Sequence, residues 1–335
     1  MNFTFDDTQD ALRELARRIF TEHATHDRLK QLEAGGQSFD AELWAALERA
    51  GLTTLGVESG PIEQCVVLIE QGRAVAPVPL WSHLIGSGAA GSADGVFTLA
   101  LDEPGADDAL AFSMRAVERD GSWSITGEKV GVPALDVAER VVVTASTPDG
   151  PAVFHTPTSG LVSERRVSTT QIPVFAVRFD QTPGEKINFD TRALAQRAIV
   201  ANCAIGVGVA ERALELTAAY TSERKQFDKP LGSFQAVQQR AADAYIDVQA
   251  MRWTMWQAAW RISEGLDADR DVAIAKFWAA EGGQRVVSAA QHLHGGLGSD
   301  IDYPLFRYTL WAKDIELEFG SATPTLARMG EALAR

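Results

Sequence analysis

The sequence predicts an α+β protein that is mostly helical, with helices first, then strands, then helices again. Apolar residues recur at helical spacing from Asp6 to about Glu70, and short runs rich in β-branched and aromatic residues follow. After Asp190 glycine and proline become scarce and long helical patterns return. We therefore expect an N-terminal helical domain (1–93), a middle antiparallel β-barrel or sandwich (94–189) and a C-terminal helical bundle (190–335).

The N-terminal region has the pattern of several short helices. Leu12, Leu15 and Ile19 mark one apolar face, and Leu43 and Leu47 mark another. Glycine and proline interrupt these patterns, and the two prolines of APVPL end the region.

Five runs in the middle region predict strands. They are separated by DG, PG and GE turns: VFTLALDE, SWSITGEKV, RVVVTAST, PAVFHT and FAVRFDQT. Their short, regular spacing favours an antiparallel barrel or sandwich over a parallel sheet.

One long helix of the C-terminal region is expected to be apolar on two faces. Val248 and Met255 fall on one face, and Trp253, Trp256 and Trp260 fall on another. Such a helix belongs inside a bundle or at an interface. Helical spacing alone explains the tryptophans, so we interpret them as packing residues.

Composition disfavours several function classes. The 335 residues include 31 Lys and Arg against 45 Asp and Glu, and the net charge of −14 argues against nucleic acid and anionic membranes as partners. Cys65 and Cys203 lie far apart in apolar surroundings, without metal-ligand spacing. We find no signal-peptide pattern and no stretch long and apolar enough to span a bilayer, so we expect a cytoplasmic protein.

Two stretches in the last third of the chain carry a specific pattern: ERKQFDKPLGSFQAVQQR from Glu223 and QHLHGGLG from Gln291. With YPLFRYTLWAKDIELEFGSAT and the order of elements, they resemble the acyl-CoA dehydrogenase family over essentially the whole chain. The resemblance implies that family's fold with a C-terminal four-helix bundle, FAD as the cofactor, and an electron-transferring flavoprotein as the acceptor. It also implies a glutamate that removes the α-proton of an acyl-CoA thioester while the β-hydride moves to the flavin.

In this family the bundle of one subunit reaches the AMP half of the flavin held by its neighbour. The resemblance assigns that role to Arg224, Phe227, Gln235, Gln291, Gly295 and Gly296. A guanidinium forms charge-assisted hydrogen bonds to a pyrophosphate, and glycines let main-chain N–H groups approach it. Taken singly, Arg224 also fits a solvated helix end and the glycines fit a helix C-cap. His292 and His294 lack the further ligands of a metal site, so we expect no metal.

The catalytic position departs from the family pattern. Members that perform the reaction carry the base just before a glycine, and alignment on Gly320-Ser321 places Phe319 there. A phenylalanine cannot accept a proton. The other base position used in the family falls near Ala198 and holds no carboxylate, and Glu211 lies about three turns further along the helix.

The segments that cover the flavin ring in this family are also changed. VGVPAL, from Val130 to Leu135, replaces a tryptophan-isoleucine-threonine patch. The segment ALDEPGADDA, from Ala100, keeps Glu103-Pro104-Gly105 but lacks the usual serine and threonine pattern. After Val57 a loop that lines the acyl pocket is short, which leaves room for a bulky acyl group.

These observations lead to one main hypothesis and two alternatives. In the first, the chain is the non-catalytic subunit of an α2β2 heterotetramer, and it resembles the short subunit of actinobacterial dehydrogenases that act on steroid side-chain CoA thioesters. In the second, it is a self-sufficient dehydrogenase whose base has moved to Glu318 or Glu316, which on a continuous helix point about 100° and 60° away from Phe319. An ion pair with Lys313 is the simpler role for these glutamates. The third hypothesis is a flavin-free scaffold.

Overall fold

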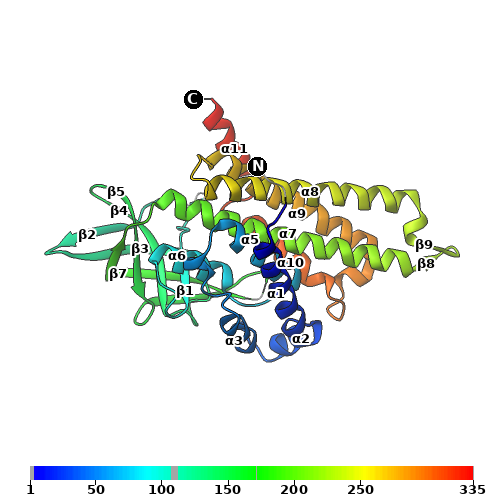
Figure 1. The fold of residues 1–335 in the computed structure, drawn as a ribbon, viewed down its shortest axis with the longest axis horizontal. Helices are drawn as coiled ribbons and strands as arrows, with labels where there is room; N and C mark the ends of the chain where they lie inside the picture. The colour runs from blue at the N-terminus through cyan, green and yellow to red at the C-terminus, as the bar shows by residue number, and fades with distance from the viewer. Residues whose placement is uncertain (1–3, 107–111, 171, 335) are drawn as a thin grey trace. The chain divides into compact units, whose positions relative to one another are not determined.

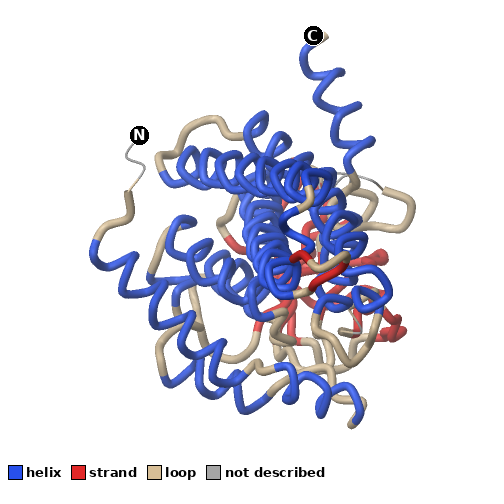
Figure 2. The backbone as a smooth tube through the Cα atoms, turned by 90° about the vertical axis from the view of Figure 1, so that its right-hand side faces the viewer, coloured by secondary structure: helices blue, strands red, loops and turns tan. Residues whose placement is uncertain are grey.

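The computed structural model describes residues 4–106, 112–170 and 172–334 (Figure 1). Helices extend to Ala90, and they return at Thr191 after a region of strands. The predicted mostly helical α+β fold class is confirmed, and Figure 2 shows the predominance of helix over strand.

Contacts between Cα atoms divide the chain into two compact units, each built from separate stretches of sequence. We call residues 1–29, 65–76 and 200–335 the helical unit. Residues 30–64 and 77–199 form the barrel unit. Cys65 and Cys203 are both buried, as expected for structural thiols.

Among the described residues, six helices precede the strands: α1 Asp7–His23, α2 His26–Ala34, α3 Ala41–Arg49, α4 Leu55–Glu58, α5 Pro61–Ala74 and α6 Leu80–Ala90. A capping box starts α1, because the Asp6 carboxylate accepts the Gln9 N–H at 2.8 Å and the Gln9 side chain accepts the Asp6 N–H at 3.2 Å. Ala16, Ile19 and Phe20 form its buried face.

The described part of the strand region forms seven strands: β1 Phe97–Ala100, β2 Arg115–Arg119, β3 Ser122–Pro133, β4 Arg140–Thr147, β5 Gly150–Pro157, β6 Val162–Val167 and β7 Pro173–Ile187. The order is β1-β4-β2-β3-β7-β5, and β5 also pairs with β4, so the sheet closes into a barrel. Most pairings are antiparallel, as predicted, but β4 pairs in parallel with β1 and β2.

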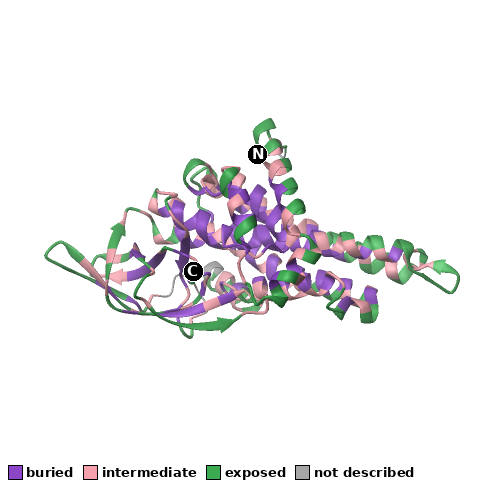
Figure 3. Cartoon of the chain, turned by 90° about the horizontal axis from the view of Figure 1, so that it is seen from below, coloured by how far each residue is buried: buried purple, intermediate pink, exposed green. Residues whose placement is uncertain are grey.

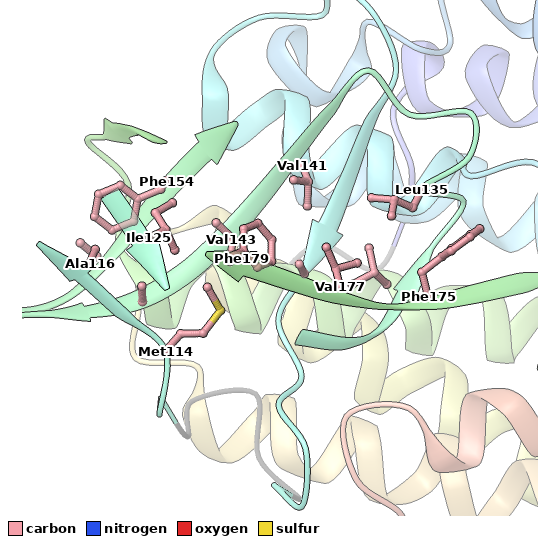
Figure 4. Packing of buried hydrophobic residues seen from close by; sticks show 14 residues of the cluster. Met114, Ala116, Ile125, Leu135, Val141, Val143, Phe154, Phe175, Val177 and Phe179 are labelled. Atoms are coloured by element: carbon pink, nitrogen blue, oxygen red, sulfur yellow. The ribbon is translucent and has the colours of Figure 1, made fainter. Parts of the chain in front are cut away.

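The barrel encloses apolar side chains that alternate along its strands (Figure 4). Ile125, Phe154 and Phe179 are each at most 1% exposed. The barrel unit also buries an ion pair in which Lys129 Nζ lies 2.9 Å from a Glu103 carboxylate oxygen. Lys129 donates further hydrogen bonds to the Leu101 carbonyl and the Thr144 hydroxyl, which satisfies its buried charge.

The remaining elements begin after the barrel: α7 Thr191–Glu223, β8 Lys225–Gln226, β9 Lys229–Pro230, η1 Leu231–Ser233, α8 Gln235–Ser263, α9 Asp269–His294, η2 Gly295–Ser299, α10 Leu305–Leu317 and α11 Ala322–Leu333. Two glycines let α5 and α7 approach closely in the helical unit. A Cβ on Gly72 would lie 2.1 Å from the Ile205 carbonyl oxygen, and one on Gly208 would lie 2.0 Å from that of Ile69. No larger residue fits at either position without a backbone shift.

The expectation that no stretch could span a bilayer by length and composition was wrong for α7. This helix has 33 residues and is long and apolar enough, but 78% of its most apolar segment is buried in the protein. The same composition serves a core helix, which sequence cannot distinguish from a membrane span without knowledge of burial.

Candidate functional site

A short hairpin follows α7 at one end of the helical unit, where α7 stops and α8 starts (Figure 1). β8 and β9 are joined by Phe227 and Asp228, whose φ angles of 53° and 61° are both in the left-handed region. Two consecutive positive φ angles match the two-residue turn of type I′. The hairpin is anchored by the Leu231 N–H, which donates to the Arg224 carbonyl at 2.8 Å.

The side chains predicted to bind FAD on this hairpin all point away from the core. Phe227 is 86% exposed and its only ring contact among described residues is edge-on to Phe234, with centroids 6.3 Å apart. Arg224 and Gln235 are also exposed, Gln235 as the first residue of α8. Figure 3 shows the hairpin at the tip of the long helices, mostly coloured as exposed. These three side chains are therefore accessible to a ligand.

The hairpin carries positive charge that the chain does not neutralise. Arg224, Lys225 and Lys229 are exposed and form no ion pair with any residue that the structure describes. Exposed cations of this kind suit a phosphate group, which accepts charge-assisted hydrogen bonds.

The second predicted motif forms a tight turn at the end of α9. Gly295 has a φ of +62°, which favours glycine, and starts η2. A Cβ on Gly295 or Gly296 would meet nothing within 4 Å, whereas one on Gly298 would lie 3.0 Å from the backbone of Gln291. Gly298 is therefore required for packing, but Gly296 is required neither for packing nor for a positive φ. The open space above Gly296 fits the close approach of a dinucleotide.

An aromatic stack brings the two motifs to the same end of the helical unit. Tyr220, one turn before Arg224, stacks on His294 with centroids 4.5 Å apart and an angle of 18°. His294 shares hydrogen bonds with the Ala290 carbonyl at 2.8 Å and the Tyr303 hydroxyl at 3.1 Å, and burial lowers its pKa. His294, which its position in the sequence suggested only as a metal ligand, instead joins the two motifs, and no sequence pattern signals this role. Among the described residues no group of three His, Cys, Asp or Glu could hold a metal.

The residue at the family's base position is buried and lies outside a helix. α10 ends at Leu317, Glu318 is extended, and Phe319 has a φ of 58° with 5% exposure. The angles of about 100° and 60° expected for a continuous helix therefore do not apply to Glu318 and Glu316. Gly320, with a φ of 95°, continues the turn.

Both alternative bases are held by neighbouring side chains. Glu318 accepts a hydrogen bond from the Asn202 amide at 2.5 Å. Glu316 pairs with Lys313 at 2.5 Å, as the sequence suggested. Lys276, which is 1% exposed, donates to the carbonyls of Ile315 at 2.5 Å and Glu316 at 3.3 Å and so caps the end of α10.

The other base position, near Ala198, holds no carboxylate in the sequence. Ala198 is fully buried, and the guanidinium of the adjacent Arg197 lies 5.3 Å from the Phe189 ring centre. Burial lowers the pKa of Arg197. Glu211 is buried in the helical unit, where its carboxylate forms ion pairs with Arg73 at 3.0 Å and with Arg252. These pairs, and not proton transfer, explain why a carboxylate stands there.

The segment at the family's ring-covering position offers few hydrogen-bond donors. Val132 is fully buried. Two N–H groups of the segment already donate within the backbone: Val130 N–H to the Asp102 carbonyl at 2.9 Å, and Ala134 N–H to the Pro173 carbonyl at 3.5 Å. The Glu103 carboxylate also has partners within the barrel unit, because it accepts hydrogen bonds from the Lys129 ammonium group and from the Ser113 N–H. Burial alone would raise the pKa of Glu103, but these hydrogen bonds lower it. The positions 107–109 of the ALDEPGADDA segment lie outside the described residues.

Known proteins are similar to this chain along its whole length. Residues 192–333 match the family model described as Acyl-CoA dehydrogenase, C-terminal domain. Acyl-CoA dehydrogenase FadE27 of Mycobacterium tuberculosis is 36% identical over 375 residues, covering 100% of this chain and 99% of FadE27. A variant of the Tcur3481–Tcur3483 steroid ACAD has a TM-score of 0.92 at 39% identity and 98% coverage of each chain. The ChsE4–ChsE5 complex of Mycobacterium tuberculosis has a TM-score of 0.92 at 34% identity, covering 100% of this chain and 99% of that chain.

Proposed function

Because the chain belongs to the acyl-CoA dehydrogenase family, we propose that it is the non-catalytic subunit of a heteromeric, FAD-dependent member of that family. Proteins of this family are FAD-binding flavoproteins and oxidoreductases. The partner subunit supplies the catalytic glutamate and the flavin-ring contacts. This chain supplies contacts to the AMP end of the partner's FAD.

One observation carries the proposal: the base position holds a buried phenylalanine, while Arg224, Phe227 and Gln235 are exposed and the turn at Gly295 and Gly296 is open. Phe319 cannot accept a proton, and Glu318 and Glu316 are held by Asn202 and Lys313. A chain that kept its own chemistry would need an accessible base near its operating pH.

The exposed motifs are suited to the dinucleotide end of FAD. Arg224 donates charge-assisted hydrogen bonds to the pyrophosphate, and Phe227 packs against the adenosine. Gln235 and Gln291 donate amide hydrogen bonds, while Gly295 and Gly296 leave the main-chain N–H groups accessible. When bound, FAD is the hydride acceptor. The residues of this chain hold the cofactor and exclude water around its AMP end.

Steroid side-chain CoA thioesters are the proposed substrate class. One similar structure is a steroid ACAD, and another is a complex of ChsE4 with ChsE5. We place two copies of each chain in the assembly, in the cytoplasm, with an electron-transferring flavoprotein as the acceptor.

Flavin stoichiometry tests the proposal. The chain is expressed alone and together with an acyl-CoA dehydrogenase-like partner encoded beside it, and flavin absorbance is measured per chain. We expect one FAD per pair of chains, none on this chain alone, and turnover only in the complex. One FAD per chain with turnover in the absence of a partner would favour a self-sufficient enzyme using Glu318 or Glu316. A complex with no flavin would favour a scaffold.

A further inference from the structure

The barrel unit has a cavity that the proposed function does not use. Its volume is about 660 Å³, within the range of small-molecule sites. It lies at the starts of β3 and β4 and near the ends of β5 and β7, which pair in the order β3-β7-β5-β4 (Figure 1). Its lining contains no residue of the β8–β9 hairpin or of the glycine turn.

The register between these strands gathers the lining from distant parts of the sequence. Trp123 lies opposite Gly184 across β3 and β7, and Arg140 lies opposite Pro157 across β4 and β5. Lys186 follows two residues after Gly184 on β7. The lining therefore combines two cations with the flat side chains of a tryptophan and two prolines.

Lys186 lines the cavity with a charge that the chain does not neutralise. Its Nζ lies 5.2 Å from the centre of the Trp123 ring, and that ring packs on Phe154 with centroids 5.3 Å apart. Phe154 is fully buried in the barrel, so the core holds Trp123 in place. A cation–π contact positions an ammonium group but leaves its charge available to an anion. Lys186 forms no ion pair with any residue that the structure describes.

Arg140 supplies the second cation in a similar way. Its guanidinium carbon lies 5.9 Å from the centre of the Phe97 ring, which is fully buried and lies opposite Arg140 in the pairing of β1 with β4. Arg140 is half-buried, and within the described ranges it too forms no ion pair. Its contact with the ring uses none of its N–H donors, which suit a carboxylate or a phosphate.

The cations of the lining outnumber its carboxylates. Glu185 is the one carboxylate among the described lining residues, and its side chain is 77% exposed. It lies 3.3 Å from His155 Nε2, so it forms no ion pair with either Arg140 or Lys186. The cavity therefore carries a net positive charge, although the net charge of the chain is −14.

We propose that this cavity binds a small organic anion that carries a planar ring, such as a mononucleotide or an aromatic carboxylate. Arg140 and Lys186 hold the anionic group through charge-assisted hydrogen bonds. The half-buried indole of Trp123 and the rings of Pro157 and Pro183 offer flat apolar surface to the ring of the ligand. The site needs neither flavin nor a partner subunit, so it does not rest on the proposed function.

Isothermal titration calorimetry with four probes tests the site. AMP and benzoate carry both a ring and a negative charge, whereas inorganic phosphate lacks the ring and adenosine lacks the charge. Each probe is titrated into the full chain at constant ionic strength. Lys186→Gln and Arg140→Gln each remove one charged contact, so we expect the dissociation constant of the ring-bearing anion to rise about tenfold. Lys186→Arg keeps the charge and should bind nearly as well as the unaltered chain. Arg178→Gln, an exposed arginine of β7 outside the cavity, is the matched control.

The outcomes separate this site from the proposed FAD contacts. Saturable binding of AMP or benzoate that weakens in Lys186→Gln and Arg140→Gln, but not in Arg178→Gln or Arg224→Ala, supports the proposal, and the tighter probe identifies the anionic group. Binding that is lost in Arg224→Ala but kept in both cavity variants overturns it, since the probe then binds the hairpin. Absence of saturable binding of both ring-bearing anions also overturns it, as does binding of inorganic phosphate or adenosine that is equally tight. Circular dichroism and urea denaturation confirm that each variant is folded, and none of these measurements depends on flavin or turnover.

Discussion

At the scale of single residues, the β8–β9 hairpin exposes side chains that make few contacts with the rest of the described chain. Phe227 and Asp228 both adopt positive φ angles, and for residues other than glycine each such conformation costs on the order of 1 kcal/mol. The turn displays an aromatic ring that is 86% exposed. The pairing of β8 with β9 through a type I′ turn accounts for this conformation, whereas the exposure of the Phe227 ring is consistent with the proposed contact to adenosine.

Arg224→Ala is the first prediction at this scale. In the co-expressed complex we expect the variant to retain FAD about tenfold less tightly, because a charge-assisted hydrogen bond to the pyrophosphate is lost. Flavin released on gel filtration at low protein concentration measures the effect. Arg270→Ala is the control, since Arg270 is an exposed arginine of the same unit outside both motifs. Retention equal to that of the unaltered complex would remove Arg224 from the site.

The glycine turn gives a matched pair of variants. A Cβ on Gly298 would lie 3.0 Å from the backbone of Gln291, so Gly298→Ala should lower the free energy of unfolding by about 1–3 kcal/mol. Gly296→Ala meets only open space, so its stability should be unchanged while FAD retention falls. Urea denaturation and flavin release distinguish the two effects. If Gly296→Ala retains FAD normally, the main chain there is not close to the cofactor.

The motif residues could be predicted from the sequence, but the long-range contacts that bring the two motifs together could not. Arg224, Phe227 and Gly295 occur in two short stretches with specific spacing. The Tyr220–His294 stack that brings these stretches together joins residues 74 positions apart, and no periodicity links them. Long-range packing of this kind depends on the tertiary fold.

At the scale of elements, the strands missed from the sequence are those without an apolar face. β6 is exposed at all six positions and β2 at four of five, so alternation of polar and apolar residues gave no signal. The parallel pairing of β1 with β4 was also missed, because register between distant strands is set by the closed barrel. The end of α10 was misjudged because Lys276, 39 residues before Ile315, caps it.

His83 connects α6 with two neighbouring segments and gives a pH prediction. Its Nδ1 accepts the Phe97 N–H at 3.2 Å, so Nε2–H donates to the Thr53 carbonyl at 3.0 Å and the ring is neutral. Burial lowers the pKa of His83 from 6.5 to about 4. The unfolded chain therefore binds the proton first as the pH falls, and the stabilisation present above about pH 6.5 is lost progressively down to about pH 4.

The expected size is about 2 kcal/mol in the free energy of unfolding between pH 7 and pH 5. His83→Gln keeps one donor and one acceptor but cannot titrate, so this part of the pH dependence should disappear. Urea denaturation of both proteins at the two pH values measures the difference. An identical pH dependence in the variant would show that another group is responsible.

At the scale of the whole molecule, the proposed function gives this chain one half of a flavin site and leaves the other half to its partner. The helical unit presents exposed cations and an open glycine turn, both suited to a dinucleotide. The barrel unit buries Val132 and uses the N–H groups of Val130 and Ala134 within its own backbone. In the proposed function another chain completes the site, so we expect this chain to be inactive on its own.

Phe319→Glu tests this division directly. A glutamate restored at the base position contributes typically about 10²- to 10⁴-fold to a reaction whose other parts are in place. Here the segment at the ring-covering position offers few hydrogen-bond donors, so we expect the variant alone to bind no FAD and to show no dehydrogenation of steroid-CoA or short-chain acyl-CoA with a dye acceptor. Because Phe319 is 5% exposed, the new carboxylate should also destabilise the fold, and circular dichroism with urea denaturation measures that cost. Phe319→Leu provides a folded apolar control. Flavin-dependent turnover by Phe319→Glu without a partner would mean that only the base had been lost and that the rest of the site belongs to this chain.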